Sequence, residues 1–182
     1  MKKLKTSELN RLSIEDFQRS EKNPVVVVLD NIRSMNNIGS VFRTCDAFRV
    51  QQLFLCGITA TPPHREIQKT ALDATESVDW KYFEETSQAI QYLKENEFTV
   101  YAVEQTDTSL LLDNIEIKSA EKIALVFGNE INGVSEEALK LCDHGLEIPQ
   151  YGTKHSLNIS VSAGIVLWEI ISKIKTGNAL QN

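Results

Sequence analysis

The sequence contains no apolar run long enough to cross a lipid bilayer. Stretches such as residues 25–29 are far shorter than the roughly 20 apolar residues of a membrane helix. The sequence after Met1, Lys2 and Lys3 is largely polar, so we expect no apolar segment of a signal peptide at the N-terminus. With 182 residues, the chain has the size of one ordinary domain. We therefore expect a soluble, cytoplasmic protein with one core and no membrane association.

The sequence also has few cysteines and no excess of basic charge. Its three cysteines, Cys45, Cys56 and Cys142, form neither a Cys-x-x-Cys pair nor a metal-ligand spacing. We interpret them as reduced core thiols, and no metal is expected. The 19 basic and 25 acidic residues give a net charge of -6, which argues against a general nucleic-acid coat protein. A local basic site for a structured RNA is compatible with this charge.

Apolar segments without alternation predict strands that are buried on both faces. The segments are residues 25–29, 53–56, 99–103 and 123–127, and two further candidates are 80–83 and 145–148. Strands of this kind belong to parallel sheets covered by helices. Helical stretches separate them, at residues 38–48, 67–73 and 87–96. The sequence therefore predicts an α/β fold with a mostly parallel sheet flanked by helices.

The two ends of the chain differ from this central pattern. Residues 1–24 are polar, and Ser13 followed by acidic residues predicts a short helical N-terminal extension. The main domain is expected at residues 25–176, with a tail at 177–182. The last predicted helix, residues 156–174, is apolar around most of its circumference. Such a helix needs cover on more than one side, which favours a homodimer; the alternative is a central core helix in a monomer.

Three loops that follow strands are candidates for the functional site, because α/β sheets bind ligands beyond the carboxyl ends of their strands. They are residues 31–43, 128–133 and 149–158. In the middle loop, Glu130 stands where a dinucleotide fingerprint has its second glycine, and its carboxylate would repel a pyrophosphate. The loop suits a ligand with an adenine and a ribose but no pyrophosphate, such as S-adenosyl-methionine. The alternative is an ordinary tight turn before a helix that starts at Ser135.

The three loops, in this order and spacing, resemble the three motifs of the SpoU/TrmH class of the SPOUT superfamily. Motif one is similar to residues 37–48, motif two to 125–133, and motif three to 148–158 with the helix that follows. The resemblance covers about residues 24–174. It implies a sheet whose C-terminal segment forms a deep trefoil knot, with S-adenosyl-methionine bound inside the knot. It also implies methyl transfer to an RNA ribose 2′-hydroxyl, and a dimer with the active site at the subunit junction.

The resemblance assigns roles to individual residues. The catalytic positions are Asn37, Arg43, Glu130, Ser156 and Asn158, and the cofactor contacts are Gly128, Ile148 and Leu157, to which Val103 is added as the end of another strand. Arg43 matches the arginine near the target hydroxyl. Because a guanidinium normally stays protonated, we expect it to stabilise the developing alkoxide while a phosphate oxygen or water accepts the proton. Simpler interpretations are that Asn37 caps a helix beginning at Ile38, and that Ser156 caps the last helix.

The expected substrate is RNA, with tRNA favoured over rRNA. Residues 43–47 are similar to the sequence in tRNA-modifying members, and the chain lacks the accessory domain common in rRNA-modifying ones. The alternatives are methylation of rRNA, methylation of a base, and a catalytically silent RNA-binding module. Candidate phosphate contacts are Lys154, His155, Arg33, Arg65, Lys69, Lys2, Lys3, Lys5 and Arg11.

Overall fold

The computed structural model describes residues 1–5, 8–118 and 121–179, and it contains a seven-stranded sheet in the order β3-β2-β1-β6-β4-β7-β5. All the strand pairings are parallel. The strands are β1 (Asn23–Asp30), β2 (Val50–Cys56), β3 (Trp80–Phe83), β4 (Thr99–Val103), β5 (Leu110–Leu111), β6 (Ile123–Phe127) and β7 (His144–Glu147). The predicted parallel α/β sheet is confirmed, and its carboxyl ends lie along one edge.

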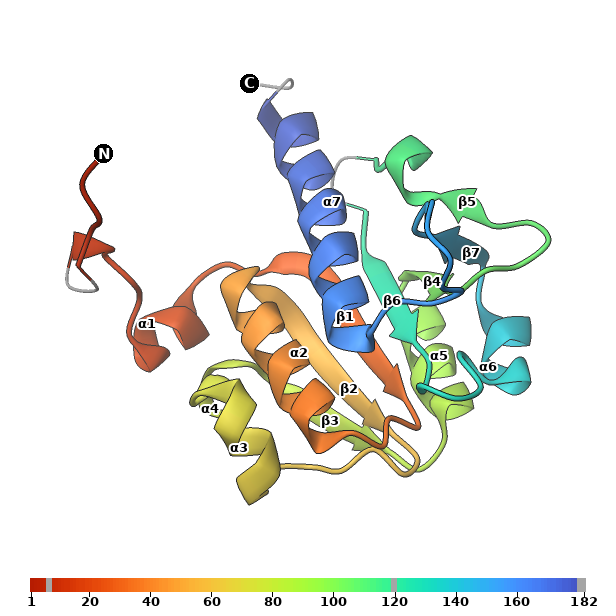
Figure 1. Cartoon of the computed structure of the whole chain (residues 1–182), viewed down its shortest axis with the longest axis horizontal. Coiled ribbons are helices and arrows are strands. Elements are labelled where there is room, and N and C mark those ends of the chain that lie inside the picture. The colour runs from red at the N-terminus through yellow and green to blue at the C-terminus, as the bar shows by residue number, and fades with distance from the viewer. Residues whose placement is uncertain (6–7, 119–120, 180–182) are drawn as a thin grey trace.

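Helices cover both faces of the sheet (Figure 1). They are α1 (Ile14–Arg19), α2 (Met35–Ala47), α3 (Arg65–Ala71), α4 (Ala74–Ser77), α5 (Thr86–Glu95), α6 (Glu136–Leu141) and α7 (Ile159–Ala179), with a 3-10 turn at Leu112–Asn114. One core cluster joins the sheet to α2, α3 and α7, and a second joins the opposite face to α5 and α6. Within the described residues, no helix combines the length and the apolar character that a bilayer crossing requires.

The centre of the sheet explains why its strands were predictable. Residues 25–30 of β1 are all buried, and β1 pairs with β2 on one side and β6 on the other. Side chains on both faces of such a strand enter a core, so the apolar run is continuous rather than alternating. The short edge strand β5 was not predicted, because two exposed leucines give no pattern to detect.

Two helix starts differ from the predictions. Helix α2 begins at Met35, and Ser34 caps it by accepting the Asn37 N–H at 3.3 Å, so Asn37 lies in the first turn and is not the cap. Helix α7 begins at Ile159, so Ser156 does not cap it; the Asn158 carboxamide oxygen accepts the Ser160 N–H at 2.9 Å instead. Asn37 and Ser156, two of the predicted site residues, therefore do not cap these helices.

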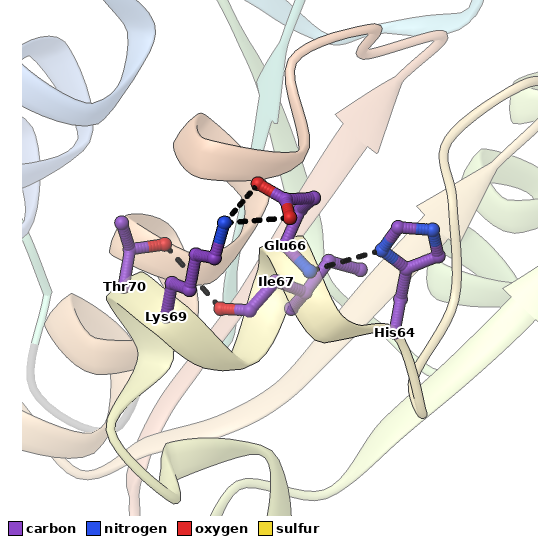
Figure 2. Close-up of polar contacts among 5 residues, drawn as sticks. All are labelled: His64, Glu66, Ile67, Lys69 and Thr70. Carbon is purple, nitrogen blue, oxygen red and sulfur yellow. Dashed lines mark hydrogen bonds and ion pairs between the residues drawn. The ribbon is translucent and has the colours of Figure 1, made fainter.

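Helix α3 fixes the first turn of α2 through close contact. A Cβ added at Gly39 would fall within 3.0 Å of the Ile67 carbonyl and the Thr70 hydroxyl, so only glycine allows this approach. Thr70 Oγ1 donates to the Asn36 carbonyl at 3.0 Å. Figure 2 shows the start of α3, where His64 Nδ1 accepts the Glu66 N–H at 3.2 Å. This packing sets the position of the turn that carries Asn37.

Helix α1 packs against the main domain, and α7 runs nearly to the C-terminus. Phe17 of α1 is 5% exposed within the core cluster, and helix α7 continues to Ala179. The division into an extension, a domain and a tail stays a prediction, and residues 180–182 of the tail lie outside the described residues. The trefoil knot also stays a prediction.

Candidate functional site

A chain of hydrogen bonds joins the three predicted loops. The Asn37 side-chain amide on α2 donates to Glu130 Oε1 at 2.7 Å, and its carbonyl oxygen accepts from Asn158 Nδ2 at 3.2 Å. Glu130 follows β6, and Asn158 directly precedes α7. The partners are 93 and 121 residues apart in the sequence, so only the tertiary fold brings them together.

Beside this chain lies a cavity of about 340 Å³, here called the loop pocket. It forms where β4, β6 and β7 end, as expected for a parallel sheet. The lining residues are Val103, Glu104, Gln105, Phe127, Gly128, Asn129, Glu130, Gly133, Leu146, Glu147, Ile148, Gln150, His155, Ser156, Leu157, Asn158, Ile159 and Ser162. Seven of the nine predicted site residues are therefore in one pocket, and Asn37 contacts two of them.

The loop after β6 has a compact shape that depends on glycine. Asn129 and Gly133 exchange two backbone hydrogen bonds of 3.0 Å, and Asn129 Oδ1 accepts the Ile131 N–H at 3.0 Å. A Cβ on Gly128 would fall within 3.0 Å of the Gly133 and Val134 backbone. The loop thus closes on itself with Glu130 inside it, and the Glu130 carboxylate accepts from Asn37.

Two acidic side chains outside the predicted set hold the end of this loop. Glu104 Oε2 accepts the Val134 N–H at 3.1 Å, and Asp30 Oδ2 accepts the Ser135 N–H at 2.7 Å. Asp30 is fully buried, and its other oxygen accepts from the Thr86 hydroxyl at 2.5 Å. Sequence reasoning missed both, although each occupies or follows the last position of a strand, where site residues of parallel sheets gather.

The charge of the loop pocket selects against phosphate. Glu104, Glu130 and Glu147 line it, whereas no lysine or arginine is among its lining residues. An acidic lining attracts a cation and repels an anion. Apolar Phe127 and Leu157 supply surface for a flat ring. S-adenosyl-methionine, with a sulfonium, an adenine and no phosphate, fits this combination.

Arg43 does not line the loop pocket. It is exposed on α2, six residues after Asn37 and so about 9 Å further along the helix axis. It borders a second cavity of about 930 Å³ between α2 and α7, here called the helix groove, which shares Ile148 with the loop pocket. Within one chain, Arg43 therefore lies outside the pocket that seven predicted site residues line, although it shares the helix groove with Ile148.

The cysteines are unsuited to nucleophilic chemistry. Cys45 and Cys56 are buried, and burial raises the pKa of the Cys56 thiol to about 12 and the pKa of Cys45 further. Cys142 is only partly buried, unlike the predicted core thiol, although burial is again the main cause that raises its pKa to about 12. All three are free, and a thiol is a poor nucleophile when its thiolate is disfavoured.

A parallel α/β sheet with a pocket that fits S-adenosyl-methionine at the carboxyl ends of its strands is typical of an α/β methyltransferase. The profile of the SpoU rRNA methylase family matches residues 24–168. The chain belongs to this family. The predicted class and cofactor, an RNA methyltransferase that uses S-adenosyl-methionine, are thereby confirmed.

Individual relatives agree with this membership. The chain is 33% identical to the tRNA (guanosine(18)-2′-O)-methyltransferase of Thermus thermophilus, over 90% of this chain and 82% of that protein. It is 30% identical to a 23S rRNA (guanosine-2′-O-)-methyltransferase of Neisseria meningitidis, over 88% of this chain and 63% of that protein. The crystal structure of an AdoMet-bound rRNA methyltransferase from Sinorhizobium meliloti superimposes with a TM-score of 0.76 and 26% identity, covering 90% of this chain and 61% of that one.

Proposed function

We propose that this protein transfers the methyl group of S-adenosyl-methionine to a ribose 2′-hydroxyl of tRNA in the cytoplasm. The observation that carries the proposal is the hydrogen-bonded chain of Glu130, Asn37 and Asn158 at the edge of the loop pocket. It presents fixed polar groups next to the space for the methyl donor. The tRNA preference is supported by the relatives. This chain matches 82% of the length of the Thermus tRNA enzyme and 63% of the length of the Neisseria rRNA enzyme.

Different residues of the loop pocket hold the adenosine part and the positively charged part of the donor. Backbone groups around Gly128 and Ile148, with the apolar Val103 and Leu157 side chains, hold its adenosine part. The bound donor supplies an electrophilic methyl group on a sulfonium. Glu130, fixed by Asn37, contributes negative charge to a pocket that prefers a cation.

On the acceptor side, Asn158 and Ser156 orient the ribose, and Arg43 stabilises the charge that develops on its 2′-oxygen. Placement of the two reactants lowers the barrier by roughly 7 to 11 kcal/mol in well-oriented systems. The guanidinium stabilises the alkoxide, and a phosphate oxygen of the RNA or a water accepts the proton.

A homodimer gives Arg43 its place in this scheme. Helix α7 exposes an apolar stripe at one-turn spacing, Val161 at 50%, Ile165 at 39% and Trp168 at 64% exposure. The stripe borders the helix groove, whose rim includes Arg43. A second copy that covers the stripe removes apolar surface from water, and it brings the Arg43 of one subunit toward the loop pocket of the other.

The direct test uses purified protein, methyl-labelled S-adenosyl-methionine, and separate tRNA and rRNA transcripts. We expect label in tRNA, recovered after hydrolysis as a 2′-O-methylnucleoside. In the Arg43→Ala variant, turnover should disappear while donor affinity stays within a few-fold, because Arg43 is outside the loop pocket.

The other outcomes of this test refute particular parts of the proposal. Label on a base would replace the ribose hydroxyl as the acceptor, and label only in rRNA would overturn the tRNA substrate. Donor binding without transfer to any RNA would identify a catalytically silent RNA-binding module. Full turnover by Arg43→Ala would remove Arg43 from the mechanism.

A further inference from the structure

A third cavity, of about 460 Å³, lies on the side of α2 away from the loop pocket. Its walls come from the N-terminal segment 10–17, the end of α2, and the α3 to α4 turn. Three arginines line it, Arg11, Arg43 and Arg49, and we call it the arginine cavity. Arg43 also borders the helix groove, so the arginine cavity begins at a residue that the proposed mechanism places at the target ribose.

The three guanidinium groups are available for a ligand. Each of these arginines is exposed, and among the residues that the structure describes, no ion pair or side-chain hydrogen bond joins any of their guanidinium groups. Two acidic residues, Asp46 and Asp73, also line the cavity, and Asp46 Oδ2 accepts the Ser77 hydroxyl. The lining therefore carries a net charge of +1 in a chain of net charge -6.

The wall formed by the N-terminal segment is anchored. Phe17 is 5% exposed in the core, and Gln18 Nε2 donates to the Glu76 carbonyl of α4 at 2.9 Å. Ser13 caps α1 by accepting the Asp16 N–H at 3.1 Å. The contacts of Phe17 and Gln18 hold α1 against the body of the protein, and Arg11 lies two residues before the Ser13 cap.

Unusual backbone conformation is concentrated at this cavity. Positive φ values occur at Asn10 (46°), Arg49 (47°), Leu72 (49°) and Asp73 (67°), which all line it. Such conformations are uncommon for residues other than glycine and cluster where function demands a particular geometry. At Arg49, the left-handed turn directly after α2 sets the direction in which the side chain leaves the backbone.

We propose that the arginine cavity binds phosphate groups of the substrate RNA next to the target nucleotide, with Arg11 and Arg49 as the phosphate ligands. The guanidinium fork matches phosphate geometry and gives stronger contacts than neutral hydrogen bonds. The inference rests on the proposed function, since it takes the RNA strand to pass Arg43. It gives an acidic protein a local group of three arginines at which an RNA strand can bind.

The test compares the double variant Arg11→Gln/Arg49→Gln with the control Arg19→Gln/Lys140→Gln, which changes net charge equally at exposed residues outside the cavity. Fluorescence anisotropy measures tRNA affinity, and initial rates give kcat and KM. We expect the cavity variant to raise the Kd and KM for tRNA at least about 10-fold, with kcat and donor affinity within two-fold. The slope of log affinity against log salt should fall by about 1.5, since each lost phosphate contact removes 0.7 to 0.9.

The possible failures are distinguishable. If the cavity variant binds tRNA with the affinity and salt slope of the control while both methylate it, the inference fails and the proposed function stands. If the wild-type protein binds no RNA, both fail. A parallel measurement with 10 mM inorganic phosphate tests whether the cavity binds a free anion instead. If phosphate raises the melting temperature of the wild type but not of the cavity variant, while both proteins bind tRNA with equal affinity, RNA is not the ligand.

Discussion

Substitution of Gly128 by alanine tests whether the closed loop after β6 is required for donor binding. The added Cβ falls within 3.0 Å of backbone atoms of Gly133 and Val134, and backbone atoms cannot rotate away. Relief requires opening the loop, which breaks the two hydrogen bonds between Asn129 and Gly133. Overpacking costs about 1 to 3 kcal/mol, the two bonds about 1 to 3 kcal/mol together, and reduced freedom of the unfolded chain returns about 0.4 to 1 kcal/mol.

The two costs are alternatives, so the expected net loss is about 0.5 to 2.5 kcal/mol whether the loop stays closed or opens. If the loop stays closed, overpacking lowers the free energy of unfolding by that amount in urea titrations. If the loop opens, the lost hydrogen bonds lower it by a similar amount, and the Kd for S-adenosyl-methionine in calorimetry also rises by about 10-fold or more. Gly177→Ala is the matched control, because a Cβ there meets nothing within 4 Å and alanine favours the helix by about 0.5 to 1 kcal/mol. Wild-type stability together with wild-type donor affinity in Gly128→Ala would refute the reasoning.

Three further predictions concern the buried carboxylate, a buried thiol and the exposed stripe. Asp30→Ala leaves the Thr86 hydroxyl and Ser135 N–H without their acceptor, so the free energy of unfolding should fall by about 2 to 5 kcal/mol; a loss below about 1 kcal/mol in urea titrations would contradict this role. Burial raises the pKa of Cys56 to about 12, so its neutral thiol stabilises the fold below the usual thiol pKa of about 8.5 and loses this contribution as pH rises toward 12. The stability advantage of the wild type over Cys56→Ala should shrink across that range, and an advantage that grows would show the sign to be wrong. Trp168→Glu places a charge in the exposed stripe of α7 and should give a monomer with little RNA methylation; sedimentation showing an unchanged dimer would move the interface elsewhere.

The fold was largely predictable because its central strands are continuous runs of apolar residues. The run in β1 is apolar on both faces, and the order of strands and helices then favours a parallel sheet. The start of α2 was missed by three residues because residues 34–37, with Met35 as their one apolar side chain, show no helical periodicity. The start of α7 was predicted too early for the opposite reason, since Leu157 continues the apolar pattern while its backbone is outside the helix.

The candidate site was predictable only in part. The three loops were found because they follow strands and resemble known motifs, and seven predicted residues do line one pocket. Glu104 was missed, since a single acidic residue after a strand carries no distinctive signal until its contact with Val134 is seen. The separation of Arg43 from the pocket follows from helix rise: six residues along α2 lead away from Asn37.

The sequence by itself determined the α/β class, the four central strands and the loops in which functional residues gather. These properties depend on neighbours along the chain, which apolar patterns and turn residues reveal. The tertiary structure alone decided that Asn37 bonds Glu130 and Asn158, and that Arg43 faces two other cavities. The physical reason is the strand order: β6 inserts between β1 and β4, and this insertion brings the first and second loops together although about ninety residues separate them.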